Sequence, residues 1–227
     1  MNTLDQSLGQ LAREIPGATG VFHAHQLDFC CGGQHSLREA AGRKGLDAAA
    51  IAARLDRLRA DPVDADAADW NREPLGRLID HVLARFHTRH REQLPELIRL
   101  ALRVEQVHAA HPDCPAGLAD HLRNMQQELE SHMQKEEDVL FPILAMGQGA
   151  RAGAPITVMR MEHEQHGEAL AQLDALTRDT TPPAGACTTW RALYAGLRTL
   201  REDLMEHIHL ENNILFERAA AGVPAHA

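Results

Sequence analysis

Apolar side chains recur every three to four residues along four stretches of the chain after residue 75. This spacing is typical of amphipathic helices that bury one face. Three segments rich in Gly, Pro and small polar residues separate the stretches, at 111–117, 147–155 and 180–188. Four long helices with short connections predict an antiparallel up-down-up-down bundle over residues 75–220.

The first 60 residues show helical spacing in shorter stretches, Leu4–Leu11 and Ile51–Leu58. Between them the sequence DFCCGG at 28–33 interrupts the pattern, because consecutive glycines favour a turn. Residues 61–74 are rich in Asp and Ala and contain two prolines. We therefore predict an all-α protein with a small helical N-terminal domain at 1–60, a linker at 61–74 and the bundle.

The bundle sequence contains an internal duplication. The pattern His-x-x-His-x-Glu begins at His87 in the first helix and at His163 in the third, 76 residues later. The pattern His-x-x-x-Glu-x-x-x-Leu-Phe begins at His132 in the second helix and at His207 in the fourth, 75 residues later. Two similar helix pairs related by a pseudo-twofold axis are predicted.

Four polar residues interrupt the apolar stripes of the second and fourth helices: His132, Glu136, His207 and Glu211. One His–Glu pair at this spacing is ordinarily a solvated surface pair. Two copies at core positions are different, because an unpaired buried carboxylate costs several kcal/mol and two of them repel. A metal ion between the carboxylates removes both penalties, so the duplication favours a metal site.

The types of ligand atom limit which metal ions can bind at this site. Four imidazoles and two carboxylates in a helical bundle suit two irons with open coordination positions, while a structural zinc site closes its shell with four ligands. Manganese and mixed occupancy also fit these donors. One sorting gives His87 and His132 to one iron, His163 and His207 to the other, and makes Glu136 and Glu211 the bridges.

Helical periodicity leaves two choices open. His87 and His90 share a helix face, as do His163 and His166, because each pair is three residues apart. Either member of each pair can face the metal.

Charge and cysteine content exclude several functions. The chain has 23 Lys and Arg against 32 Asp and Glu, a net charge of −9, which disfavours nucleic acids and anionic membranes as partners. No apolar run approaches the roughly 20 residues of a membrane span, and no signal peptide is visible at the N-terminus, so we predict a cytoplasmic protein. The four cysteines include no C-x-x-C pair, so His and carboxylate ligands are expected to hold the metal.

Five segments together resemble the repair of iron centres family, the di-iron iron–sulfur cluster repair proteins with a hemerythrin-like domain. They are DFCCGG, RFHTRHREQLPEL, SHMQKEEDVLFP, MEHEQHGE and HIHLENNILFERA. The resemblance implies an oxo- and carboxylate-bridged di-iron centre, and it resolves both open choices toward the first histidine. The implied ligands are His87, His132, Glu136, His163, His207 and Glu211.

The same resemblance implies a function. A protein of this family helps to repair iron–sulfur clusters damaged by nitric oxide or oxidants, by donating iron or by handling nitric oxide. Its partners are damaged iron–sulfur proteins, with nitric oxide or oxygen species as small ligands. The oligomeric state is left open between a monomer and a homodimer.

Two other functions use the same ligands. One is a di-iron nitric oxide reductase or peroxide-reducing enzyme, so the sequence does not decide whether the protein is an enzyme. The other is a hemerythrin-type oxygen or nitric oxide binding protein. Oxygen carriers place a further ligand where this chain has Gly167 and use an aspartate near Glu211, so the sequence disfavours simple oxygen transport.

Four further residues are accessory candidates. Glu128 lies one turn before His132, on the same predicted stripe, and Glu162 directly precedes His163. Each is either an ordinary helix charge or a group that orients a histidine, moves protons or guides iron, and the resemblance favours the second role. Cys30 and Cys31 are either small buried side chains or accessible thiols that form a strained disulfide or hold a labile metal or nitrosyl. The resemblance implies that this segment contacts a partner or transfers electrons.

Overall fold

The computed structural model describes residues 2–60 and 68–222. Every regular element in these ranges is a helix, apart from one isolated antiparallel bridge between Ser7 and Ser36. The all-α prediction is confirmed. Residues 61–67 of the predicted linker lie outside the described ranges, and none of the described helices is long and apolar enough to cross a membrane.

The chain divides into two compact units. The bundle unit consists of Asp80–Ile143 and Ala154–Leu204, and the mixed unit consists of Met1–Ile79, Leu144–Gly153 and Met205–Ala227. The predicted domains are continuous ranges with boundaries at residues 60 and 75, whereas each of these units combines separate segments of the chain. The predicted boundaries therefore stay a prediction.

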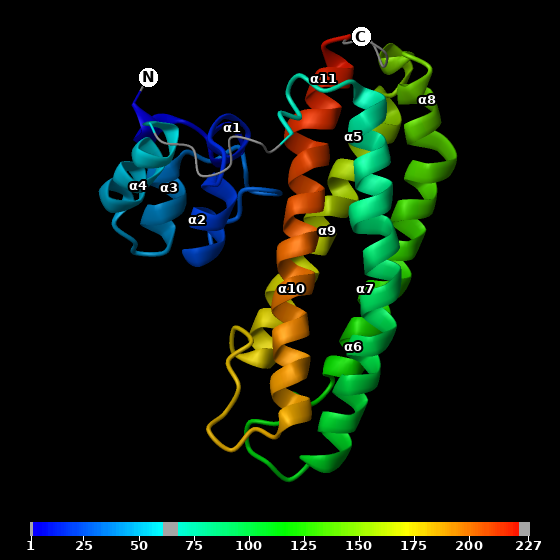
Figure 1. The fold of residues 1–227 in the computed structure, drawn as a ribbon. Coiled ribbons are helices and arrows are strands. Elements are labelled where there is room, and N and C mark those ends of the chain that lie inside the picture. The colour runs from blue at the N-terminus through cyan, green and yellow to red at the C-terminus, as the bar shows by residue number, and fades with distance from the viewer. Residues whose placement is uncertain (1, 61–67, 223–227) are drawn as a thin grey trace. The chain divides into compact units, whose positions relative to one another are not determined.

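Four helical rods contribute segments to the bundle unit (Figure 1). The first comprises α5 (Leu75–Val82), η2 (Leu83–His87) and α6 (Thr88–Val107); the second comprises α7 (Leu118–Lys135), η3 (Glu136–Leu140) and α8 (Phe141–Ala145); the third is α9 (Gly153–Thr177); the fourth comprises α10 (Thr188–Leu210), η5 (Glu211–Leu215) and α11 (Phe216–Ala220). Gly117 starts α7 from a left-handed conformation, φ 86°, which glycine adopts without strain.

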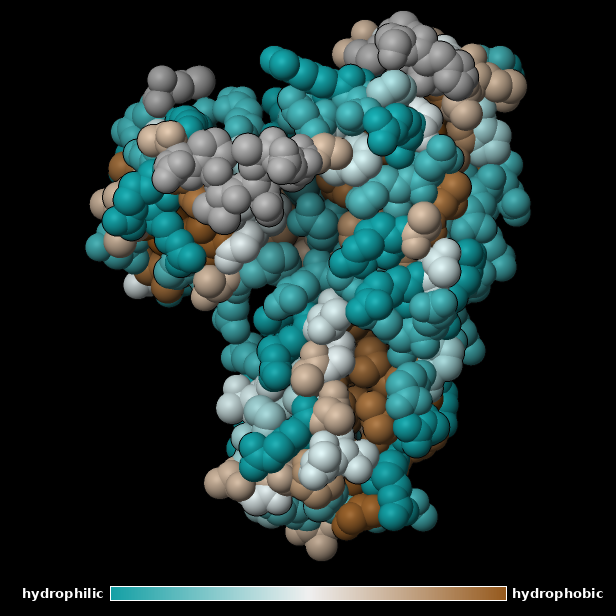
Figure 2. All heavy atoms as spheres, viewed as in Figure 1, coloured by the Kyte–Doolittle hydropathy of each residue, from teal (hydrophilic) through white to brown (hydrophobic). Residues whose placement is uncertain are grey.

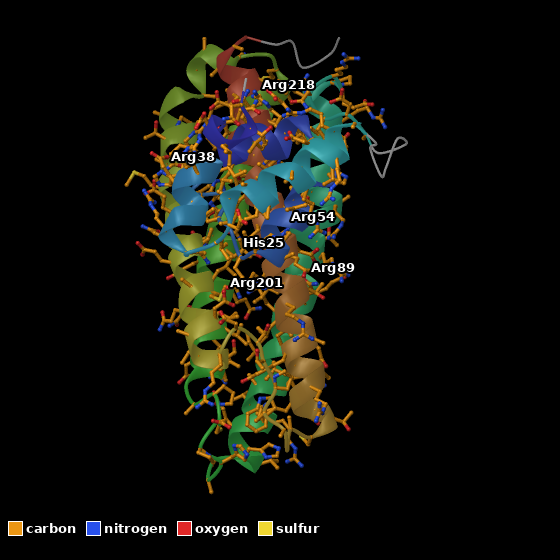
Figure 3. The ribbon with its side chains drawn as sticks, turned by 90° about the vertical axis from the view of Figure 1, so that its left-hand side faces the viewer. His25, Arg38, Arg54, Arg89, Arg201 and Arg218 are labelled. Atoms are coloured by element: carbon orange, nitrogen blue, oxygen red, sulfur yellow. The ribbon has the colours of Figure 1, made fainter. Side chains whose placement is uncertain are left out.

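Polar contacts join each helix of the bundle unit to its neighbours. Arg91 on α6 pairs with Glu130 on α7 at 2.8 Å, and His121 on α7 lies 2.9 Å from the Ala169 carbonyl on α9. Arg201 on α10, labelled in Figure 3, pairs with Asp174 on α9 at 3.0 Å. These contacts, together with the short connections, give the order α6, α7, α9, α10 around the bundle.

Helices α6 and α10 approach closely at Gly196. A Cβ atom there would lie 2.6 Å from Leu97 Cδ2. Figure 2 shows apolar side chains in a shallow groove between these helices, where Leu97, Leu100 and Gly196 are among the lining residues. The missing side chain at residue 196 therefore allows the two helices to pack tightly.

Three of the rods contain a five-residue π-helical segment, which the sequence analysis did not predict. The segment η2 ends at His87, η3 begins at Glu136 and η5 begins at Glu211. A π turn rotates the residues after it relative to a continuous α-helix. This is why Val139, which a continuous α-helix would bury on the same face as His132 and Glu136, is 49% exposed, while Leu140 is buried.

The mixed unit contains the short helices of the N-terminal region: η1 (Thr3–Asp5), α1 (Leu8–Glu14), α2 (Ala18–Ala24), α3 (Leu37–Arg43) and α4 (Ala48–Ala60). Its apolar core includes Leu8, Phe22, Leu37 and Leu55. A capping box between Ser36 and Glu39 starts α3, as Ser36 satisfies a backbone N–H of the first turn. The C-terminal end of α10, η5, α11 and the short helix η4 (Gly149–Arg151) belong to the same unit.

Candidate metal centre

Three predicted ligands meet inside the bundle unit. His132 on α7, Glu136 at the start of η3 and His163 on α9 offer ligand atoms within 4.8 Å of one another, and all three are buried. Nε2 of His132 lies 3.1 Å from Nε2 of His163 and 3.4 Å from Oε2 of Glu136. Nitrogen and oxygen atoms at these separations can share one metal ion.

Glu136 also faces a histidine of the first rod. Nε2 of His87 lies 3.4 Å from the same Oε2 atom of Glu136. The Glu136 carboxylate, which is 0% exposed, therefore lies between two imidazole rings from neighbouring helices. A carboxylate in this position can bridge two metal ions.

The pairing of histidines differs from the sorting made from the sequence. His132 lies against His163, whereas the sequence sorting gave these residues to different irons. That sorting is wrong because it followed the order of helices along the chain, and the contact is set by the packing of α7 on α9.

Burial does not separate the two histidines of each helix pattern, since His90 and His166 are buried as well. Contacts distinguish them. The His90 ring stacks on Phe86 at 6.4 Å, and the His166 ring packs edge-on against His132 at 5.0 Å, whereas Nε2 of His163 faces Nε2 of His132. The geometry thus favours the first histidine of each pattern.

Two further carboxylates contact the Nδ1 atoms of His87 and His132, on the side of each ring away from Glu136. Nδ1 of His87 lies 2.7 Å from Oε1 of Glu137, and Nδ1 of His132 lies 2.9 Å from Oε2 of Glu162. An ionised carboxylate only accepts hydrogen bonds, so each imidazole donates from Nδ1 and keeps Nε2 as a lone-pair donor for a metal. This carboxylate–histidine arrangement orients metal-ligating histidines and raises their basicity.

Hydrogen bonds from the imidazoles and from nearby cations keep Glu137 and Glu162, the outer carboxylates, ionised. The hydrogen bond from His132 lowers the pKa of Glu162 to about 2, with Lys135 adding to the effect against the opposing influence of burial. For Glu137, burial alone would raise the pKa, but hydrogen bonds from Arg91 and His87 outweigh it and the pKa is lowered. Both groups therefore accept hydrogen bonds at neutral pH.

Of the two accessory glutamates predicted from the sequence, only Glu162 contacts a histidine ring of the site. Glu162 does touch a ring, although the ring belongs to His132 on α7 rather than to its neighbour His163. Glu128 is exposed, so the prediction that it shares the buried stripe of His132 is wrong. Glu137 was missed, because regular α-helical geometry points the residue after Glu136 away from the core.

The second copy of the His-x-x-x-Glu pattern lies in the mixed unit. His207 and Glu211 are both buried, and Nε2 of His207 lies 3.2 Å from Oε1 of Glu211. Glu211 opens the π segment η5 as Glu136 opens η3. The duplication therefore extends from the sequence to the backbone conformation.

The predicted turn at DFCCGG is attached to the same part of the mixed unit. Asn212 Nδ2 donates to the carbonyl oxygen of Cys30 at 3.2 Å, and Asn213 Nδ2 donates to that of Phe29 at 3.2 Å. The Phe29 ring packs edge-on against His209 at 5.4 Å. These two asparagines and His209 were not singled out from the sequence, where nothing links them to the turn about 180 residues earlier.

The donor set fits iron. Neutral imidazoles and ionised carboxylates suit iron or manganese, and thiolate is absent from the described His–Glu clusters. Glu136 and Glu211, both fully buried, supply negative charge that a cation would compensate. The arrangement is suited to binding metal ions in a water-poor interior.

Two family models match the chain. The hemerythrin HHE cation binding domain matches residues 78–219, and a domain of unknown function matches residues 4–59. Curated relatives named iron–sulfur cluster repair protein YtfE cover nearly all of it. The protein of Citrobacter koseri is 50% identical over 98% of this chain and 100% of its own length, and that of Pectobacterium atrosepticum is 52% identical over 96% and 98%. The protein of Yersinia pseudotuberculosis is 50% identical over 98% and 100%. The chain therefore belongs to the hemerythrin HHE family and, within it, to the iron–sulfur cluster repair proteins that its motifs resemble.

Proposed function

We propose that this protein repairs iron–sulfur clusters damaged by nitrosative or oxidative stress, and that a di-iron centre serves this function. The observation that carries the proposal is the buried Glu136 carboxylate, held between His87 and His132 while outer carboxylates bind the far side of each ring. A helix surface would not need such an arrangement. The proposed ligands are His87, His132, Glu136, His163, His207 and Glu211.

The duplication suggests how six ligands serve two irons. The pseudo-twofold relation exchanges His87 with His163 and His132 with His207. Nε2 of His132 faces Nε2 of His163 in the structure, and by the sequence symmetry we propose His87 and His207 as the second pair. We assign one iron to each pair, with Glu136 and Glu211 as the two bridges.

The protein's own residues would hold and tune the centre. Glu137 and Glu162 orient the rings of His87 and His132 and raise their basicity, while Arg91 and Lys135 keep these carboxylates ionised. When bound, iron would supply redox chemistry and positions open to small ligands. Glu136 and Glu211 would balance part of the metal charge and leave coordination positions open, which suits either release of iron or binding of nitric oxide.

The proposed partners are damaged iron–sulfur proteins, because the relatives are named for cluster repair. We place the activity in the cytoplasm, where such clients are made. The net charge of −9 supports recognition of proteins rather than of nucleic acid.

The test measures iron content and repair in the same anaerobic samples. We expect about two irons per chain in the wild type and clear loss in Glu136→Ala and Glu211→Ala, since each removes a bridging ligand. Asp138→Ala, an exposed carboxylate two residues from Glu136, is the matched control and should keep its iron. The wild type should reactivate an iron–sulfur enzyme inactivated by nitric oxide, and the two bridge variants should not.

Two results would overturn the proposal. Equal iron content in the wild type and in the bridge variants would remove the metal centre. Sustained turnover of nitric oxide or peroxide with a chemical reductant, without any reactivation of the damaged enzyme, would identify the protein as the competing di-iron enzyme.

A further inference from the structure

A second cluster of potential metal ligands lies in the DFCCGG turn, outside the His–Glu patterns. Asp28, Cys30 and Cys31 offer ligand atoms within 4.8 Å of one another. The two Sγ atoms are 3.7 Å apart, and Sγ of Cys30 lies 3.3 Å from Oδ1 of Asp28. Asp28 is exposed and Cys31 is partly exposed, so the cluster can be reached from solvent.

The spacing of the thiols matches a shared metal ion. Two thiolates bound to one tetrahedral metal at about 2.3 Å lie about 3.8 Å apart. A disulfide is disfavoured, since Cα atoms of adjacent residues are about 3.8 Å apart and disulfides usually need about 4.4–6.8 Å. The positions of these two cysteines therefore favour chelation of a metal ion over a disulfide bond between them.

The turn is held in this conformation before any ligand binds. Oδ1 of Asp28 accepts hydrogen bonds from the backbone N–H groups of Cys30 at 3.2 Å and Cys31 at 2.9 Å. Asn212 binds the Cys30 carbonyl from the other side. A Cβ atom at Gly33 would lie 2.5 Å from the Phe29 carbonyl oxygen, so the close return of the chain depends on glycine. Such preorganisation lowers the entropic cost of binding.

Charge in the cluster also favours a cation. The Asp28 carboxylate lies beside the thiols, and a bound cation would offset the negative charge of the carboxylate and of the thiolates. Metal binding would replace thiol protons, which leave to solvent.

We propose that Asp28, Cys30 and Cys31 form a second cation site, selective for borderline or soft divalent ions such as Fe²⁺. Three protein ligands leave a fourth tetrahedral position open, through which a thiolate of another protein can take over the ion by ligand exchange, with no change in oxidation state. As an iron-holding site during transfer, it rests on the proposed repair function. As a binding site, it stands on the geometry alone.

The experiment uses the full chain, reduced and anaerobic, with its iron content determined first, and then titrated with Co²⁺ as the probe. Thiolate ligation of Co²⁺ gives an intense charge-transfer band in the near ultraviolet that nitrogen and oxygen ligands lack. We expect one equivalent of Co²⁺ per chain to produce this band in the wild type. Cys31→Ser should lower the band at one equivalent of Co²⁺ by at least half, because one thiolate ligand is lost, and Cys187→Ser, which changes an exposed thiol outside the cluster, should leave it unchanged.

Asp28→Asn provides a variant that preserves the turn. The Asn side-chain oxygen can still accept the two backbone N–H bonds, while the charge is lost. We expect Co²⁺ to bind at least about tenfold more weakly, with an unchanged helical circular dichroism spectrum.

Absence of the thiolate band in the wild type, or an equal band in Cys31→Ser, overturns the inference. The repair proposal is judged separately by the iron content of the same samples. If the chain lacks iron at its His–Glu centre and still shows the band, the proposed function is contradicted and the cysteine site is supported. If the chain is loaded with iron and shows no band, the cysteine site is contradicted and the proposed function is supported.

Discussion

At the scale of single residues, the partners of each imidazole matter as much as the imidazoles themselves. His87 and His132 each donate Nδ1–H to an outer carboxylate, and each presents Nε2 to the same oxygen of Glu136. A histidine buried for packing alone would need no second carboxylate. The outer carboxylates are therefore the residues at which mutation best separates metal binding from folding.

Replacing Glu137 with Gln tests this role. The amide oxygen can still accept from His87, but the lost charge lowers the basicity of the ring, and metal affinity should fall about 10–100-fold. Competition with a chelator measures the affinity. Glu130→Gln is the matched control, because Glu130 pairs with the same Arg91 without touching His87, and it should bind metal as the wild type does. Equal affinity in both variants would contradict the role of Glu137.

A second residue-scale prediction concerns Asp203, a buried carboxylate on α10. Arg85 and Arg89 of the first rod pair with it at 2.6 and 2.9 Å, and Gln93 donates to it at 3.1 Å (Arg89 is labelled in Figure 3). Asp203→Ala should lower the free energy of unfolding by about 1–3 kcal/mol in urea denaturation, while the exposed neighbour in Glu202→Ala should be near neutral. Similar losses in both variants would refute the assignment.

The same carboxylate gives a pH dependence. Although burial opposes it, hydrogen bonds from Arg85, Arg89 and Gln93 lower the pKa of Asp203 below its usual value. Because the folded pKa is the lower one, the stabilisation is complete above about pH 4 and is lost as the pH falls further. The stability difference between wild type and Asp203→Ala should therefore shrink in acid. A difference that grows below pH 4 would contradict this sign.

At the scale of elements, the π-helical segments decide which side chains face the core. Two of them start at the glutamates of the duplicated pattern, Glu136 and Glu211. π turns are uncommon and often mark functional sites. Here they allow the glutamate and the following Leu-Phe pair to be buried in one rod.

The π segment η3 makes opposite predictions for two adjacent residues. Val139 is 49% exposed and Leu140 is 1% exposed. Val139→Ala should change the free energy of unfolding by less than about 0.5 kcal/mol, whereas Leu140→Ala should cost about 2–5 kcal/mol. Denaturant unfolding of the metal-free chain gives both values. A regular α-helix with Val139 in the core would instead make the Val139 variant costly.

At the scale of the whole molecule, the two buried carboxylates of the proposed metal centre lower the stability of the metal-free chain. Glu136 and Glu211 occupy positions where an apolar side chain would stabilise a helical bundle, and both are 0% exposed. Their desolvation opposes folding until a cation compensates their charge. Metal that binds the folded state alone adds stability, about 2.7 kcal/mol at a free concentration of 100 Kd.

Glu136→Gln should therefore change stability with opposite signs in the two states. Without metal, removal of the buried charge should raise the free energy of unfolding by about 1–3 kcal/mol. With iron present, the variant should be less stable than the wild type, because a proposed metal ligand is lost. Thermal unfolding with and without chelator measures both, and Asp138→Asn is the exposed control. The same sign in both states would mean that Glu136 does not bind metal.

Much of the architecture and the composition of the site could be predicted from the sequence. Apolar periodicity predicts the helices, and the duplicated patterns select the His and Glu residues because their spacing is local. Glu137 could not be found in this way, since its contact with His87 depends on the π turn and on the neighbouring rod. The pairing of His132 with His163 likewise joins residues on helices whose neighbours are set by packing.

The sequence by itself determined the all-α class, the duplication and the polar residues on apolar stripes, because these follow from the 3.6-residue period. Only the tertiary structure decided which histidines meet, which carboxylates support them, where the helices turn to π geometry and how Asn212 and Asn213 hold the cysteine turn. These features depend on contacts between segments far apart in the chain, such as Asn212 and Cys30. Side-chain packing and hydrogen-bond geometry select those contacts, and no local sequence pattern encodes them.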